Sequence, residues 1–437
     1  EADPNLAMAY WGMARSRLKM PFATKKECDE VSEWIQKAKA LAEKASVSEQ
    51  DYIRALVLRC PSDPKVDMQE LKVAYREEMK ALYNKYPEDL DAATLYVDSI
   101  METHDSYWNG SGEPIEGTLE SLDILTKVLK SNPDHIGANH FFIHCLDESK
   151  YPQRALPSAN LFEEIKKAPP HLLHMPSHIY ILLGDYQKSV EANLRAIAYD
   201  KEFKLSYDMK EIFPMHFYLF LIRSYMWQEC YEKAHAAALT TSEHDIFPYL
   251  QMLLYFQKWD ELLKISEPKG DDKSTLCFWL FARSYAFACQ NRLEEALKEK
   301  ELFLKIKKEM EKDSVIIIAA EVLEAQLSKI EGRGAEIEEH LLRAIEEADK
   351  LHFNEPPNWY YPIRQTLGAY YFQERRFDLA EETFRKALVE LPRNGRSLFG
   401  LWNSVKAQNK TDALYWVERE MKEALKYSDG AFDMKNL

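Results

Sequence analysis

The sequence predicts an all-α protein, a tetratricopeptide-like α-solenoid of stacked antiparallel helix pairs, and three observations lead to this prediction. Hydrophobic residues make up 46% of the chain and charged residues 30%, a balance typical of a folded, soluble protein. Only 13 of the 437 residues are glycine, less than half of the average usage of about 7%, which suits helices joined by short turns. A helix–turn–helix pattern also recurs along the chain, and such repeats stack around one continuous core.

The two clearest copies of this pattern are residues 182–197, LLGDYQKSVEANLRAI, and residues 372–394, FQERRFDLAEETFRKALVELPRN. Each copy ends one helix, turns and begins another; the first turns at Gly184-Asp185, and the second stops at Pro392. In each, an aromatic residue or Leu is followed three residues later by a small or aliphatic residue. This pattern resembles the tetratricopeptide repeat, a pair of antiparallel helices of about 34 residues. Weaker copies lie at 226–239, 255–265, 287–304 and 332–350.

Longer landmarks cover nearly the whole chain: DPNLAMAYWGMA (3–14), PEDLDAATLY (87–96), PDHIGANHFFIH (133–144), HLLHMPSHIYILLGDY (171–186) and EPPNWYYPIRQTLGA (355–369). They resemble the landmarks of a bacterial-type tetratricopeptide-repeat family. The resemblance implies one solenoid with N-terminal helix pairs in 1–130, histidine-rich repeats in 131–225 and a C-terminal array in 226–437. Members of that family usually carry one more helix pair before the DPN landmark, so we expect the N-terminus of this chain to be trimmed.

Composition excludes several classes of partner and chemistry. The net charge of −15 argues against nucleic acid as the main partner, because phosphate binding needs clustered Lys and Arg. No apolar run reaches the roughly 18 residues of a membrane span, so we expect a soluble protein, cytoplasmic or, if a signal was trimmed, secreted. The six cysteines show no CxxC and no close pairing, so neither a zinc knuckle nor a disulfide framework is expected. Dinucleotide, Walker, GxSxG and kinase motifs are absent from the sequence.

The first histidine stretch, residues 139–149, places His140 and His144 one helical turn apart, with Asp147 three residues further on. Residues at i, i+4 and i+7 share one face of a helix. Two neutral imidazoles and a carboxylate are ligands suited to zinc, iron, copper or manganese. The stretch therefore predicts a metal-binding face.

The second stretch contains His171, His174 and His178, with steps of three and four residues. Pro176 breaks the helical ladder and disfavours helix at the residue before it. We therefore expect a kink or a helix start at Pro176, with His174 just outside the new helix and His178 in its first turn. His216, which also follows a proline, falls on the corresponding helix of the next repeat. We expect His140, His144, His174 and His178 to converge in one pocket.

Alternatives to the metal site stay open from the sequence. A histidine on an apolar helix is often a core residue bonded to a carbonyl, and a metal-free acid–base site is a further possibility. The nitrogen-rich set disfavours calcium and magnesium and leaves iron, copper and zinc open. Five aromatic or apolar side chains are expected to wall the site and keep it dry: Phe141, Phe142, Met175, Phe213 and Phe217.

Three further residues are candidates for substrate contacts. Trp108 lies in a Gly-rich loop at 106–114 that could act as a lid, although the same loop could be a plain connection. Arg364 could clamp a carboxylate with two parallel hydrogen bonds, and the competing interpretation is an Arg–carboxylate pair between repeats. Tyr361 stands in the same segment, where packing is the competing role.

Two functions fit these observations. One is a metal-dependent oxidoreductase, with iron or copper favoured and zinc hydrolysis second, that acts on a small substrate inside the solenoid. The other is a scaffold that binds a protein or peptide in its concave groove, with purely structural histidines.

Overall fold

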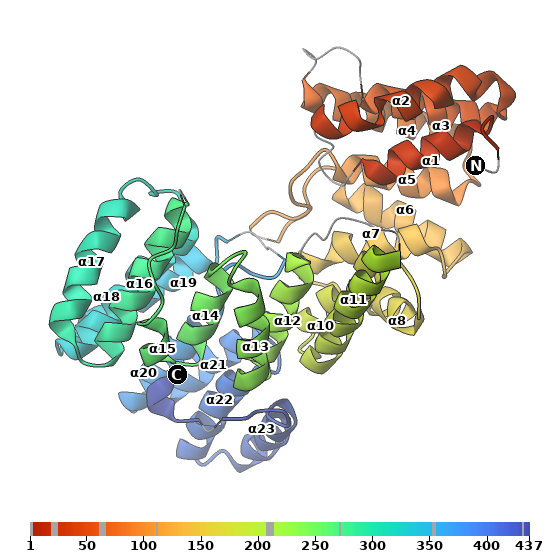
Figure 1. Ribbon diagram of the computed structural model, residues 1–437. Helices are drawn as coiled ribbons and strands as arrows, with labels where there is room; N and C mark the ends of the chain where they lie inside the picture. Colours follow the sequence, from red (N-terminus) through yellow and green to blue (C-terminus); the bar gives the residue numbers. More distant parts are fainter. Residues whose placement is uncertain are drawn as a thin grey trace. The chain divides into compact units, whose positions relative to one another are not determined.

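The computed structural model describes residues 3–18, 25–60, 67–110, 112–206, 214–270, 272–351, 355–430 and 432–437. Within these ranges helices are the regular elements, apart from one isolated bridge between Trp108 and Pro114 (Figure 1). The all-α prediction is therefore confirmed, and helices adjacent in sequence pack in pairs as a solenoid requires. No helix in the described ranges is long and apolar enough to cross a membrane.

The chain divides into two compact units, residues 1–151 and 152–437. This division falls inside the predicted histidine-rich segment 131–225. The first unit contains α1 (Ala7–Arg17), α2 (Lys25–Leu41), η1 (Ala42–Lys44), α3 (Val47–Arg59), α4 (Met68–Lys85), α5 (Leu90–Met101), α6 (Thr118–Ser131) and α7 (Ile136–Asp147).

Side-chain caps define where several of these helices begin. Ser46 accepts a hydrogen bond from the backbone of Glu49, whose carboxylate accepts one from the backbone of Ser46, so α3 begins with a capping box. The Asp89 carboxylate accepts from two backbone N–H groups at the start of α5. His135 caps α7 in the same way, because its Nδ1 accepts from the backbone N–H of Ala138 at 3.2 Å.

A disulfide joins Cys28 of α2 to Cys60 at the end of α3, with the two Cα atoms 5.3 Å apart. The expectation that no cysteines pair is wrong for these two. They lie 32 residues apart in sequence, and only the packing of α2 on α3 brings them together. Cys145, Cys230 and Cys277 are free and buried, as expected for small apolar residues, and Cys289 is partly buried.

The interior of the first unit also holds two buried ion pairs. Arg15 of α1 pairs with Asp98 of α5, and Arg59 of α3 pairs with Glu102 just after α5. Burial and then the charge of Asp98 raise the pKa of Glu102 to about 8. These pairs link α1 and α3 to the end of α5, although the three helices are distant in sequence.

The second unit contains η2 (Pro152–Ala155), α8 (Leu156–Glu164), α9 (Pro170–His174), α10 (Pro176–Leu182), α11 (Tyr186–Ser206), α12 (Met215–Trp227), α13 (Tyr231–Thr241), α14 (Phe247–Tyr255), α15 (Trp259–Leu262), α16 (Lys273–Cys289), α17 (Leu293–Lys307), α18 (Ser314–Ile330), α19 (Gly334–Ala348), α20 (Arg364–Gln373), α21 (Phe377–Glu390), α22 (Gly395–Ala407), α23 (Thr411–Ala424) and η3 (Met434–Asn436).

One turn recurs in seven hairpins of this unit: α10–α11, α12–α13, α14–α15, α16–α17, α18–α19, α20–α21 and α22–α23. In each, the second residue after the first helix has a positive φ. The next residue donates its backbone N–H to a carbonyl five residues back, as Asp185 does to Tyr180 at 2.8 Å. This is the Schellman motif. The residues with positive φ are Gly184, Glu229, Gln257, Asn291, Gly332, Arg375 and Asn409.

The predicted turn at Gly184-Asp185 is confirmed, and each of the other five repeat copies, including 332–350, contains one of these turns. Each hairpin covers the apolar face of its neighbour, and the resulting core is dense in aromatic side chains. Burying such side chains is the main favourable contribution to folding, at about 25 cal/mol for each Å² removed from water. Five phenylalanines of this core are fully buried: Phe220, Phe278, Phe281, Phe303 and Phe384.

Candidate metal centre

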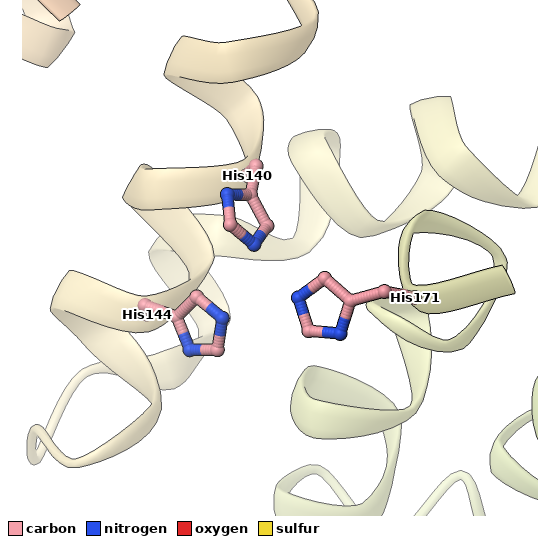
Figure 2. A group of neighbouring side chains, drawn as sticks. All are labelled: His140, His144 and His171. Atoms are coloured by element: carbon pink, nitrogen blue, oxygen red, sulfur yellow. The ribbon is translucent and has the colours of Figure 1, made fainter. Parts of the chain in front are cut away.

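The first histidine stretch forms α7, which begins at the His135 cap described above. Figure 2 shows His140 and His144 on the same face of α7, and their ring centroids are 4.9 Å apart. His144 Nδ1 lies 3.3 Å from Asp147 Oδ2. The predicted HxxxHxxD face is therefore present in the first unit. Figure 2 also draws His171, which belongs to α9 of the second unit.

The second stretch folds as predicted around Pro176. Helix α9 ends at His174, α10 begins at Pro176, and His178 lies in the first turn of α10. At the break, the Ser177 hydroxyl donates to the carbonyl of His174 at 2.7 Å. Because the two short helices almost continue one another, the i, i+4 spacing still places both imidazoles side by side. Their ring centroids are 4.8 Å apart.

His216 joins this pair from α12, whose first turn follows Pro214. Its ring centroid is 4.7 Å from that of His174 and 5.6 Å from that of His178. One nitrogen from each of the three rings lies within 4.8 Å of the other two, an arrangement that could hold a metal ion. The second unit therefore contains a three-histidine cluster, His174, His178 and His216, built from adjacent hairpins.

Hydrogen bonds fix which nitrogen of His174 carries the proton. The Asn193 amide donates through Nδ2 to the carbonyl of Ser189 at 2.7 Å, so its Oδ1 faces His174. That oxygen is 2.6 Å from His174 Nδ1. Because an amide oxygen can only accept, Nδ1 is the protonated nitrogen, and Nε2 of the neutral ring carries a free lone pair. His174 Nε2 is thereby prepared as a ligand atom.

Glu355 orients His178 in a similar way. Its Oε1 lies 3.6 Å from His178 Nδ1. This is beyond hydrogen-bond length, but the negative charge of the carboxylate favours a proton on Nδ1 and a lone pair on Nε2. The Nε2 atoms of His178 and His174 are only 2.9 Å apart. Two lone pairs at this distance repel unless a cation lies between them. The other tautomer of His178, with Nε2–H donating to His174, would turn a bare Nδ1 lone pair toward the Glu355 carboxylate.

Protonation of one of the two rings is an unfavourable way to supply that positive charge. His174 and His178 have no exposed surface, and charging a buried imidazole is costly. Burial, and next the charges that His178 and His216 would carry, hold the pKa of His174 well below 6.5. His174 is therefore a neutral imidazole, the form that binds metal ions.

The distances within the cluster suit a transition metal. Two nitrogens that bind one ion at about 2.1 Å and at right angles lie about 3 Å apart, which matches the 2.9 Å between the Nε2 atoms of His174 and His178. One nitrogen of His216 lies within 4.8 Å of the ligand atoms of His174 and His178, so His216 is the third candidate ligand. Asn193 and Glu355 would hold the rings from behind, as outer partners of metal-bound histidines do.

Apolar side chains surround the three rings, as predicted, although the set differs. Phe217 packs on His174 with ring centroids 4.9 Å apart, and Met175 is fully buried. Phe220, which the sequence analysis did not single out, contacts all three imidazoles. Phe213 lies outside the described residues, and Phe141 and Phe142 belong to α7 in the first unit. Such walls exclude water and strengthen electrostatic interactions inside the site.

The three predicted substrate-contact residues make other contacts. Arg364 donates to both carboxylate oxygens of Asp349, at 2.8 and 2.7 Å, and also pairs with Glu390, which is the competing interpretation of an ion pair between helices. Tyr361 packs against Trp359 and Tyr360. The Trp108 indole donates to the carbonyl of Cys145 at 2.8 Å, so it braces α7. A role in substrate binding stays a prediction for these residues.

Comparisons with family models and with curated proteins give no template for the site. No family model matches the chain, and no curated protein matches it. Resemblance to a tetratricopeptide-repeat family thus stays a prediction, and function is inferred from the site itself. Of the predicted metal ligands, the structure brings His174, His178 and His216 together. His171 lies one turn before His174, with ring centroids 6.2 Å apart.

Proposed function

We propose that this protein binds one transition metal ion through His174, His178 and His216, and that the metallated form is an oxidoreductase acting on a small substrate. The observation that carries the proposal is the 2.9 Å distance between the Nε2 atoms of His174 and His178, two rings without exposed surface. A divalent cation at that point removes the repulsion and satisfies both ligand atoms. The tetratricopeptide-type array is the second part of the proposal, supported by the seven Schellman hairpins.

The ligand set favours a catalytic ion over a structural one. Structural zinc is usually closed by four protein ligands, whereas three ligands leave positions for water or substrate. Nitrogen ligands without thiolate suit iron, copper and zinc. We place iron or copper redox chemistry first and zinc hydrolysis second. When bound, the ion would supply electron transfer or polarisation of a coordinated substrate, and the apolar walls would exclude competing water.

Metal content tests the first half of the proposal. We expect protein expressed in metal-supplemented medium to carry close to one equivalent of metal by elemental analysis, and His178→Ala to carry none. His235→Ala is the matched control, because His235 of the same unit is already paired with Glu261 at 2.6 Å. A parent protein that stays free of metal would contradict the proposal. The metal content of alanine variants is measured in the same series for the other predicted ligands, His140, His144, Asp147 and His171.

Oxygen consumption tests the second half. With ascorbate as electron donor, the iron- or copper-loaded protein should consume oxygen faster than the His178→Ala variant and faster than free metal at the same concentration. Rates equal to those of the free metal would leave a metal-binding protein without this oxidoreductase activity.

A scaffold function is the second candidate, and one observation favours it. A groove of about 670 Å³ runs along α16, α18 and α20 of the second unit, and its lining includes Tyr285, Gln326, Lys329 and Tyr370. Mixed aromatic and polar linings of this kind suit an extended peptide. If the scaffold function is correct, Tyr370→Ala should abolish recovery of a partner from lysate, whereas His178→Ala should leave it unchanged.

A further inference from the structure

The segment 355–361, EPPNWYY, precedes α20 and has no helical structure. It contacts the first helices of consecutive hairpins in chain order, from α10 to α16. Glu355 faces His178 of α10, Pro357 and Asn358 are held from α12 and α14, and Trp359 packs on Phe278 of α16, with ring centroids 6.4 Å apart. We call this segment the strap.

Side chains of the array hold the strap by its backbone. Arg223 of α12 donates through Nη2 to the carbonyl of Pro357 at 3.3 Å and to Gln251 Oε1 at 2.6 Å. The Gln251 amide in turn donates through Nε2 to the carbonyl of Asn358 at 2.7 Å. Trp227 donates from its indole to the carbonyl of Tyr360 at 3.2 Å. Three nearly consecutive carbonyls are therefore fixed by buried donors.

Burying the Arg223 guanidinium under the strap costs folding free energy. Its side chain is buried, and its contacts in the described structure are with neutral groups: the Pro357 carbonyl, the Gln251 amide and the Met226 sulfur. Burial lowers the pKa of Arg223 to about 10. A buried guanidinium is costly, but its hydrogen bonds are stronger than those of a neutral donor. The strap is consequently held more firmly than packing alone would hold it.

We infer that Arg223 and Gln251 are positioning residues for the metal centre: they fix the strap, and the strap places Glu355 against His178 Nδ1. The inference rests on the proposed metal-binding function. Neither residue contacts a ligand nitrogen, so both act through Glu355. With Glu355 in place, His178 keeps its proton on Nδ1 and offers Nε2 to the ion. Loss of the Glu355 charge favours the tautomer that turns Nε2–H toward His174 and closes the site.

Cobalt(II) titration of the metal-free full chain tests the inference. We expect Arg223→Met, Gln251→Leu and Glu355→Ala each to weaken cobalt affinity by about 10- to 100-fold, the usual effect of losing an outer partner of a metal ligand. Arg223→Lys, which keeps a charged donor, should recover part of the loss. The matched control is Arg283→Met, because Arg283 in the same unit pairs with Glu299 and also donates to a backbone carbonyl, that of Leu263.

A double variant separates positioning from general destabilisation. If Arg223 acts through Glu355, then Arg223→Met combined with Glu355→Ala should bind cobalt no more weakly than Glu355→Ala alone. Hydrogen exchange of the metal-free protein supplies a readout that does not depend on metal. Backbone amides of residues 355–361 should exchange faster in Arg223→Met and Gln251→Leu. Their exchange should be unchanged in Arg283→Met.

The outcomes distinguish the proposed metal binding from the positioning role of Arg223 and Gln251. Cobalt binding by the parent protein with unchanged affinity in Arg223→Met and Gln251→Leu would overturn the inference and leave the metal centre intact. Fully additive losses in the double variant, or unchanged exchange of the strap, would also overturn it. No cobalt binding by the parent protein would overturn the proposed function and, with it, the positioning role.

Discussion

The two units of the chain build similar helix pairs but stabilise them in different ways. In the first unit, individual bonds join helices that are distant in sequence: the Cys28–Cys60 disulfide and the buried pairs Arg15–Asp98 and Arg59–Glu102. In the second unit, the same Schellman turn recurs seven times around an aromatic core. A buried ion pair occurs there too, between Arg396 and Glu229, but repetition dominates.

This difference indicates why the three-histidine cluster lies in the second unit. A regular array places equivalent positions of successive first helices side by side, so His178 of α10 and His216 of α12 meet without any special loop. The same regularity leaves a path along α10, α12, α14 and α16 for the strap. In the irregular first unit, by contrast, the buried charged side chains pair with one another, as Arg15 does with Asp98 and Arg59 with Glu102.

The largest predicted effect concerns the disulfide. Cys28→Ser should lower the free energy of unfolding of the first unit by about 3–4 kcal/mol, the loop-entropy estimate for a link across 32 residues. Hydrogen exchange resolved along the chain would measure it, and amides of the second unit should not change. Equal destabilisation of both units would show that they do not differ in this respect.

Metal removal should act on the opposite unit. Chelation should lower the stability of the second unit by about 2.7 kcal/mol when free metal had been a hundredfold above Kd, because an ion bound only by the folded state stabilises it by mass action. The melting temperature with and without chelator measures this. His178→Ala should show no shift on chelation, and a shift equal to that of the parent protein would place the ion elsewhere.

The two units should also respond to pH in opposite directions. Folding raises the pKa of Glu102 to about 8 from 4.5, so the folded first unit binds the proton more tightly. The associated stability is complete below pH 4.5 and is lost as the pH rises through 8. In the metal-free second unit the pKa of His174 is lowered from 6.5, so stability is present above pH 6.5 and falls as the pH drops below it.

Urea unfolding of the metal-free protein, followed by exchange in each unit from pH 5 to 9, measures both trends. Glu102→Gln should remove the loss of stability at high pH in the first unit, and His174→Gln should weaken the loss at low pH in the second. Parallel pH profiles in the two units would contradict the assignment of these groups.

The smallest predicted effect concerns the repeated turn. Arg375 is exposed and has a positive φ of 59°, a conformation that costs a residue with a side chain about 1 kcal/mol. Arg375→Gly should therefore stabilise the second unit by up to about 1 kcal/mol. Gly332 occupies the equivalent turn position with open space around it, so Gly332→Ala should destabilise by a similar amount. Denaturation midpoints compare the two.

Much of the fold could be predicted from the sequence because helix pairs leave local signals. The break at Pro176, the positions of His174 and His178 on either side of it, and the turns at the repeat copies follow from proline geometry and from the spacing of apolar residues. Glycine marks only two of the seven turns; the repeat pattern pointed to four of the others, and the turn between α22 and α23 was missed. The i, i+4 spacing of the histidines likewise predicts shared faces.

The parts of the centre that the sequence did not reveal are contacts over long separations. Glu355 opens a landmark that the analysis examined for Arg364 and Tyr361, but nothing in its neighbourhood in the chain connects it with His178. Asn193 resembles any polar residue of α11. Convergence of His140 and His144 with the second histidine stretch stays a prediction, because those two residues belong to the first unit.

The sequence by itself determined the helices, their turns and the faces that carry histidine, because these depend on interactions within a few residues. Only the tertiary structure decided which histidines lie together, which of their nitrogens keep the proton, and that Cys28 meets Cys60. The physical reason is that protonation state and ligand geometry are set by partners that packing brings from distant parts of the chain. Asn193 lies 19 residues from His174, and Glu355 lies 177 residues from His178.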